Sequence, residues 1–200
     1  RCLVGSEMCI RDRYVAAKLN SLTDKVLMDK IIECSQAGVK VELVIRGISC
    51  LVAGVGGVTD NVQIRSIVGR YLEHARIYIF GTGVRKKVYI SSADYMTRNT
   101  TRRVEVAAPI LSEEVKKRVL DIFDTQMQDN VKARIMQPDG KYVRAERGDI
   151  FIDAQSRFYA EAYANAPKPA PVNDSKAVEP EKEKKGFLGW LKRLFRRKKK

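Results

Sequence analysis

The sequence predicts an α/β fold with a mixed, largely parallel sheet flanked by helices. Residues 14–45 follow the order strand, helix, strand, which predicts a parallel pair joined by a right-handed crossover. The second of these strands, residues 39–45, is almost continuously apolar, as is typical of a central strand covered on both faces. With 200 residues and 44% hydrophobic content, the chain is long enough for one domain with a proper core.

Capping residues delimit the elements of this first unit. Residues 14–19 form the first strand, and residues 20–24 offer hydroxyl and carboxylate caps for a helix. Gly38 ends that helix as a left-handed residue, after apolar residues at helical spacing at Val26, Leu27, Ile31 and Cys34. Arg46 directly follows the second strand, so we expect it at the carboxyl edge of the sheet, where open α/β folds usually bind ligands.

The stretch from residue 64 to residue 103 holds His74, the only histidine of the chain. The apolar run 75–80 predicts a buried strand that starts at this histidine, and a turn at 81–83 leads to a second strand over 86–90. The two strands should bring the imidazole close to Ser91, Ser92 and Asp94. Downstream lie groups suited to binding phosphate oxygens, namely Arg98, Asn99, Arg102 and Arg103.

The remaining segments complete the domain. Residues 47–61 are glycine-rich, but no third glycine falls at the interval of a dinucleotide-binding loop, so we expect a flexible loop, followed by a strand over 62–65. A strand is predicted over 103–108, ended by Pro109, and a hairpin around residues 138–140. Helices are predicted over 112–128 and 154–163, the first with a buried stripe of Val115, Val119, Ile122, Phe123 and Met127.

The two ends differ in character from the middle. Residues 1–13 show no clear period and resemble a translated sequencing adapter, so we expect a non-native segment there. Residues 166–185 are rich in Pro, Ala and acids and predict a disordered linker. Residues 186–200 predict a basic amphipathic helix that contains seven of the positive charges in a chain of net charge +14.

Several long runs resemble the last catalytic domain of the larger polyphosphate kinase family. They are SIVGRYLEHARIYIF, YISSADYMTRN and RRVEVAAPI, together with LNSLTDK and ECSQAGVKVELVIRGISCL in the family's order. The resemblance is strong over residues 14–110 and weaker to about residue 163, and it implies a phospholipase D-like domain over residues 14–165. It also implies reversible transfer of the terminal phosphate of ATP to inorganic polyphosphate. The phosphohistidine of that reaction lies in an upstream domain outside this chain, so we expect this fragment alone to be inactive.

The resemblance also implies roles for particular residues. His74 corresponds to a second histidine that faces the nucleophile, contacts the ATP phosphates and acts as proton donor or acceptor. Arg46 and Arg103 match arginines at the ATP phosphates. Candidates for a polyphosphate path are Arg65, Arg70, Arg76, Ser91, Ser92, Arg98, Asn99 and Arg102, although solvated surface arginines explain Arg65, Arg70, Arg98 and Arg102 equally well. One departure from the family is a loop at 49–57 that lacks its Arg-Pro-Gly.

The resemblance implies ATP and inorganic polyphosphate as substrates. It also implies the upstream domains of the same polypeptide as partners, and a homo-oligomeric full enzyme. Mg²⁺ is expected for the whole enzyme, but the family's metal positions lie outside this chain, so no metal ligand is assigned here. No apolar run could cross a bilayer and no secretory signal is present, which predicts a cytoplasmic protein. The basic helix suits an anionic membrane surface at the inner face of the membrane, a polyanion, or a solubilising role.

Two other functions fit the same residues. Phospholipase D relatives include phosphodiesterases that build one site from two half-motifs, and His74-Ala75-Arg76 is a degenerate copy of such a motif. A homodimer of this chain would then be the active form. The non-enzymatic alternative is a polyanion-binding module tethered to a membrane by its basic helix.

Overall fold

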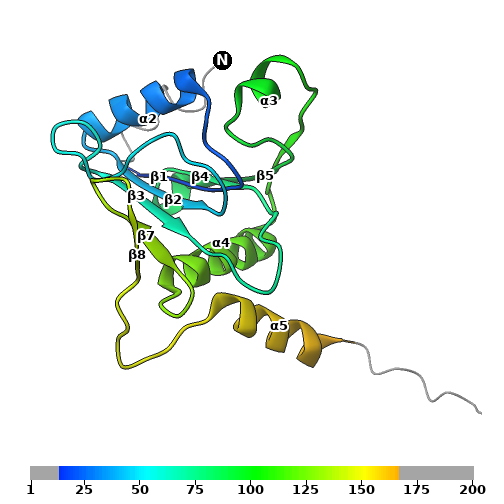
Figure 1. Ribbon diagram of the computed structural model, residues 1–200. Coiled ribbons are helices and arrows are strands. Elements are labelled where there is room, and N and C mark those ends of the chain that lie inside the picture. Colours follow the sequence, from blue (N-terminus) through cyan, green and yellow to red (C-terminus); the bar gives the residue numbers. More distant parts are fainter. Residues whose placement is uncertain (1–13, 167–200) are drawn as a thin grey trace, which may run out of the picture. The chain divides into compact units, whose positions relative to one another are not determined.

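The computed structural model describes residues 14–166, which form a mixed α/β fold (Figure 1). An eight-stranded sheet has the order β6-β5-β4-β1-β2-β3-β7-β8. Its strands are β1 (Tyr14–Leu19), β2 (Lys40–Ile45), β3 (Val62–Ser66), β4 (Ile77–Phe80), β5 (Lys87–Ser91), β6 (Ala107–Pro109), β7 (Arg134–Met136) and β8 (Tyr142–Arg144). The helices are α2 (Lys25–Gln36), α3 (Thr97–Thr101), α4 (Glu113–Gln128) and α5 (Ala154–Asn165), with a 3-10 turn at Gly83–Arg85.

The centre of the sheet confirms the predicted crossover unit. β1 pairs in parallel with β2, and β2 in parallel with β3. Asp24 caps α2 by accepting from the backbone N–H of Leu27, and Gly38 has a φ of +79° directly after the helix, as predicted. The cap residues therefore fix where the chain leaves the sheet and where it returns.

The sheet is less parallel than predicted. Within residues 14–166, only the β1–β2 and β2–β3 pairs are parallel, and the pairs β1–β4, β4–β5, β5–β6, β3–β7 and β7–β8 are antiparallel. Connection length explains two of these pairs, because the short turns at residues 81–86 and 137–141, which join β4 to β5 and β7 to β8, can join only antiparallel neighbours. β4 also runs opposite to β1, so the start of β4 meets the end of β1.

Two apolar layers enclose the sheet, with α2 on one face and α4 on the other (Figure 1). Phe123 of α4 is completely buried against the second layer, and Val119, Ile122 and Met127 pack there as predicted. Val115 was predicted to be buried, but it is 50% exposed because it lies in the first turn of α4.

Some local predictions were wrong. The strand predicted over 103–108 begins only at Ala107, and the preceding segment contains the short helix α3, which had no apolar period to indicate it. The predictions for residues 1–13, for the linker beyond Ala166 and for the helix at 186–200 fall outside the described residues. Within residues 14–166, no helix is both long and apolar enough to cross a membrane.

Candidate functional site

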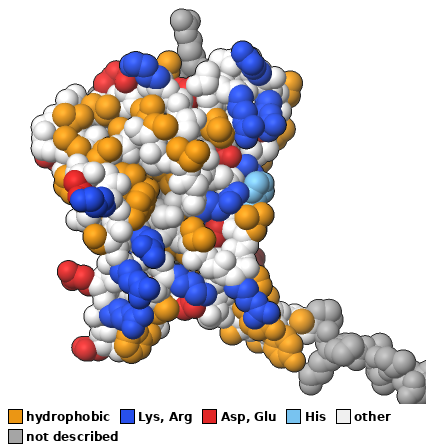
Figure 2. Space-filling view, viewed as in Figure 1, with side chains coloured by type: hydrophobic (Ala, Val, Ile, Leu, Met, Phe, Trp, Pro, Cys, Tyr) orange, Lys and Arg blue, Asp and Glu red, His pale blue; other side chains and the backbone are white. Residues whose placement is uncertain are grey.

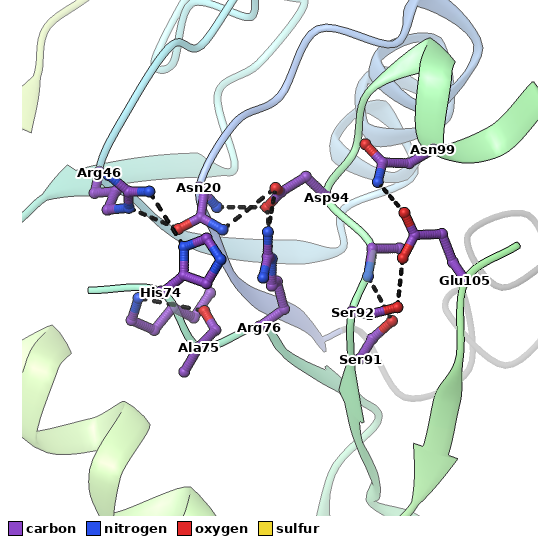
Figure 3. A network of polar contacts seen from close by, with 12 residues as sticks. Asn20, Arg46, His74, Ala75, Arg76, Ser91, Ser92, Asp94, Asn99 and Glu105 are labelled. Atoms are coloured by element: carbon purple, nitrogen blue, oxygen red, sulfur yellow. Dashed lines mark hydrogen bonds and ion pairs between the residues drawn. The ribbon is translucent and has the colours of Figure 1, made fainter. Parts of the chain in front are cut away.

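The candidate site lies at the carboxyl ends of β1 and β2. Asn20 follows β1 and Arg46 follows β2, and parallel strands end at the same edge of a sheet. β4 is antiparallel to β1, so the segment that leads into it, with His74 and Arg76, reaches the same edge (Figure 3). The strand begins at Ile77, so His74 lies on the preceding loop and not at the strand start that the sequence predicted.

Arg46 connects Asn20 with the histidine. Its Nε donates to Asn20 Oδ1 at 2.7 Å, and its Nη2 lies 3.3 Å from His74 Nδ1. A guanidinium group can only donate, so Nδ1 must accept, which leaves the proton of a neutral imidazole on Nε2. The His74 side chain is exposed, and Figure 2 shows the single histidine at the surface beside Lys and Arg side chains. The Nε2–H group is thus a donor at an accessible, basic edge.

Asp94 fixes the second arginine of the site. Arg76 donates to it in bidentate fashion, Nε to Oδ1 at 3.2 Å and Nη2 to Oδ2 at 2.9 Å. The backbone N–H and side-chain amide of Asn20 donate to the same carboxylate at 2.7 and 3.3 Å. Burial by itself would raise the pKa of Asp94, but the hydrogen bonds from Arg76 and Asn20 outweigh it and lower the pKa. Asp94 therefore stays ionised and connects Arg76 to Asn20.

A buried lysine completes the set of cations. The side chain of Lys18, on β1, is 1% exposed and lies 3.5 Å from the Glu73 carboxylate. Desolvation by burial is the main reason why its pKa is lowered, and the charges of Arg46 and Arg76 act in the same direction. Three cationic side chains thus face two carboxylates, which leaves the edge suited to an anion. Lys18 was not predicted as part of the site, although a lysine inside an apolar central strand is the signal that could have indicated it.

Gly47 keeps the turn after β2 close to β1. Its N–H donates to the carbonyl oxygen of Asn20 at 2.9 Å. A Cβ at this position would lie only 2.6 Å from that same backbone oxygen. Only glycine therefore allows the chain to turn directly after Arg46 without displacing Asn20.

The two serines and Asn99 form a separate group beyond Arg76 (Figure 3). Ser91 Oγ donates to the Val106 carbonyl at 2.8 Å, while Ser92 Oγ and the Asn99 amide both donate to the Glu105 carboxylate. These donors hold the two sides of the 92–106 loop together. The structure thus gives Ser91, Ser92 and Asn99 partners within the loop, whereas the sequence had suggested them as phosphate ligands.

The structure does not gather the remaining arginines around His74. Arg65 donates to the Asp129 carbonyl at 2.9 Å, and Arg70 lies over the Tyr71 ring at 5.5 Å. Three more have exposed side chains on or directly after α3, namely Arg98, Arg102 and Arg103. The structure therefore brings together four of the residues that the sequence predicted, namely Arg46, His74, Arg76 and Asp94.

Comparison with known proteins places this geometry in a family. Residues 9–155 match the family model described as polyphosphate kinase C-terminal domain 2. The chain belongs to the polyphosphate kinase family. The polyphosphate kinase of Lactiplantibacillus plantarum is 48% identical over 149 residues, which are 74% of this chain and 21% of that protein. The chain thus spans about a fifth of the length of this curated polyphosphate kinase.

One solved structure agrees with this assignment. The polyphosphate kinase of Porphyromonas gingivalis aligns with a TM-score of 0.74 and 33% identity, over 79% of this chain and 25% of that chain. A phospholipase D family member, Nuc from Salmonella typhimurium, aligns more loosely, with a TM-score of 0.46 and 14% identity over 70% of this chain and 90% of that chain.

The acidic side chains of the described residues do not gather into a cluster that could bind a metal ion. Among residues 14–166, no group of three or more His, Cys, Asp or Glu side chains could hold a metal ion. The two carboxylates of the site, Glu73 and Asp94, are paired with Lys18 and Arg76. The side chains at this edge therefore fit an anion and do not fit a metal ion.

Proposed function

We propose that residues 14–165 form one wall of a polyphosphate kinase active site, where they bind the phosphates of ATP and of inorganic polyphosphate. The reaction is the reversible transfer of the terminal phosphate of ATP to polyphosphate through a phosphohistidine on an upstream domain. The observation that supports this most directly is the convergence of Arg46, His74 and Arg76 at one sheet edge.

The chemistry of phosphoryl transfer suits such a wall. The protein contributes mainly positioning and the stabilisation of negative charge on the phosphoryl oxygens. Arg46 uses Nε and Nη2 for Asn20 and His74, and Arg76 uses Nε and Nη2 for Asp94. We assign the Nη1 group of each arginine to phosphate oxygens. Their internal bonds hold both guanidinium planes, so little side-chain entropy is lost on binding.

His74 is proposed to act on the transferred group. With Nδ1 accepting from Arg46, the Nε2–H group can donate a hydrogen bond to a phosphate oxygen. It can give its proton to a leaving oxygen only when the ring also carries a proton on Nδ1, which requires Nδ1 to release Arg46. Histidine suits this role because its ordinary titration range lies nearest to neutral pH. The nucleophilic histidine belongs to the upstream domain, so His74 faces it across the bound phosphates.

We expect the isolated 200-residue chain to bind tripolyphosphate but to form no phosphoprotein and no polyphosphate, because it lacks the nucleophile. Incubation with ATP labelled on its terminal phosphate, followed by separation of protein and polymer, measures both products. Label on the chain, or net polymer synthesis by it, would refute the placement of the nucleophile.

The binding half of the proposal has its own control. Arg46→Ala is expected to weaken tripolyphosphate binding about tenfold, since charge-assisted hydrogen bonds to one phosphate are lost. Lys141→Met removes the same charge from an exposed residue of the β7–β8 turn and should leave the affinity unchanged. Equal affinities for the two variants would contradict the assignment of Arg46.

Other features of the whole enzyme follow from the same proposal. We propose that Mg²⁺ and the phosphohistidine are provided outside the described residues, and that the full enzyme is a cytoplasmic homo-oligomer. Contact of residues 186–200 with an anionic membrane surface stays a prediction.

A further inference from the structure

The loop that carries His74 is supported from below by a buried ammonium group. Lys18 Nζ donates to the carbonyl oxygen of Glu73 at 3.0 Å and to that of Ala75 at 3.4 Å. These two residues flank His74 in the sequence. One lysine on a central strand therefore anchors the backbone on both sides of the histidine.

The Glu73 side chain joins three elements beneath the loop. Its Oε2 lies 3.5 Å from Lys18 Nζ on β1 and accepts from Gln126 Nε2 on α4 at 2.7 Å. Its Oε1 accepts from Gln155 Nε2 on α5 at 3.0 Å. Both carboxylate oxygens thus have partners, and the ammonium has three acceptors for its three protons.

Gln155 also binds the backbone of the loop itself. Its Nε2 donates to the Tyr71 carbonyl at 2.8 Å, and its Oε1 accepts from the Tyr71 N–H at 3.1 Å. The residue is 3% exposed, and a Cβ on Gly69 would lie 2.3 Å from its Oε1. The first turn of α5 is therefore fitted closely against the loop at residues 69–73.

We propose that Lys18, Glu73 and Gln155 are positioning residues that hold His74 beside Arg46. This inference rests on the proposed function, because it explains how the loop presents the imidazole to phosphate. A buried ion pair is a poor source of stability, since an apolar pair of similar volume often stabilises a fold as well or better. What an apolar pair cannot supply is the pair of hydrogen bonds to the carbonyls on either side of His74.

If the loop beneath His74 becomes less ordered, even small displacements of the imidazole should lower the reaction rate strongly. His74 is exposed and makes one side-chain contact in Figure 3, with Arg46, so the backbone beneath it is what fixes its position. A displacement of about 1 Å in a reacting group can lower a rate about a hundredfold. Positioning by the Lys18–Glu73 pair therefore bears directly on the proposed chemistry.

The test uses Lys18→Met/Glu73→Gln in the full 200-residue chain. The double substitution leaves the net charge unchanged and the interior neutral. The new glutamine can accept from Gln155 Nε2 and donate to Gln126 Oε1 once the Gln126 amide group turns over. Only the bonds to the two carbonyls and the ion pair are lost. Lys141→Met/Asp139→Asn makes the same exchange in an exposed ion pair and is the matched control. Gln155→Ala removes the hydrogen bonds to Tyr71 without changing Lys18 or Glu73. It provides the same test of loop order if the double variant does not fold.

The readout is nuclear magnetic resonance of the single histidine, whose ring Cε1–H group gives one signal, used here as the ring signal. Amide relaxation of residues 70–75 measures the order of the loop, and the ring signal in a tripolyphosphate titration measures local affinity. We expect both site variants to lose loop order and to bind about tenfold more weakly, with the control unchanged.

The outcomes separate this inference from the proposed function. Unchanged loop order in Lys18→Met/Glu73→Gln and in Gln155→Ala would overturn the positioning role, whatever the ligand does. A different outcome is a wild-type ring signal that shows no shift on addition of tripolyphosphate while the loop loses order in both site variants. That result would support the positioning role and contradict the proposed phosphate binding.

Discussion

Replacing His74 by alanine is expected to lower ATP-dependent polyphosphate synthesis by about 10²- to 10⁴-fold, the range for loss of a general acid or base. The measurement needs the remaining domains of a polyphosphate kinase, which a chimera provides. Residues 14–155 would replace the matching segment of the Lactiplantibacillus plantarum polyphosphate kinase, to which this chain is 48% identical. The loss is expected because the Nε2–H group, set by the contact of Nδ1 with Arg46, has no substitute at this edge of the sheet.

A second substitution separates proton transfer from binding. In His74→Asn, the side-chain oxygen can still accept from Arg46, but no group can exchange a proton near neutral pH. We expect kcat to fall as in His74→Ala while KM for ATP changes less. Near-normal turnover by His74→Ala in the chimera would show that this residue has no catalytic role.

Asp94→Asn is expected to lower the free energy of unfolding by about 3 kcal/mol, because it leaves the Arg76 charge without its counter-ion. The side chains of Asp94 and Arg76 are only 6% and 15% exposed, so water can solvate the unpaired Arg76 charge only slightly. The slight exposure of Arg76 places the value at the lower end of the range for a broken buried pair. Urea unfolding of the full chain measures it.

The same pair gives a pH dependence of known sign. The pKa of Asp94 is lowered in the folded state, so its contribution to stability is present above the unfolded pKa of about 3.9 and is lost as pH falls through the folded pKa. The stability difference between wild type and Asp94→Asn should therefore be constant from neutral pH to about 5 and shrink on further acidification. Asp29→Asn, in the exposed ion pair with Lys25, should show little difference at any pH. A constant difference down to pH 2 would show that Arg76 does not stabilise the ionised carboxylate.

The central part of the fold was predictable because local signals agree there. The apolar run at 39–45, the caps at residues 20–24 and Gly38 each indicate the same crossover unit, which β1, α2 and β2 confirm. The outer strands were harder to place, because β6 and β8 have three residues each and largely exposed side chains. β6 pairs with β5 across the long 92–106 loop, so no local period reveals that pairing, whereas the β7–β8 hairpin was indicated by its turn at residues 138–140.

The site was predictable to the extent that it follows from strand ends. Arg46, His74 and Arg76 meet because the ends of β1 and β2 and the start of β4 share one edge. Other features depend on tertiary contacts that spacing does not encode. Asn20 was read only as a helix cap, yet it links Arg46 to Asp94. Lys18 was read only as a strand residue, although its burial beneath the histidine loop makes it part of the site.

The most direct test of the account follows the His74 ring signal while tripolyphosphate is added to the full chain. A local reporter is needed because the seven Lys and Arg residues at 186–200 are expected to attract polyanions by charge alone, wherever the specific site lies. The account predicts a saturable shift of the ring signal that weakens about tenfold in Arg46→Ala and not in Lys141→Met. A ring signal that stays in place at saturating ligand, while amide signals elsewhere in the chain move, would contradict a phosphate site at His74.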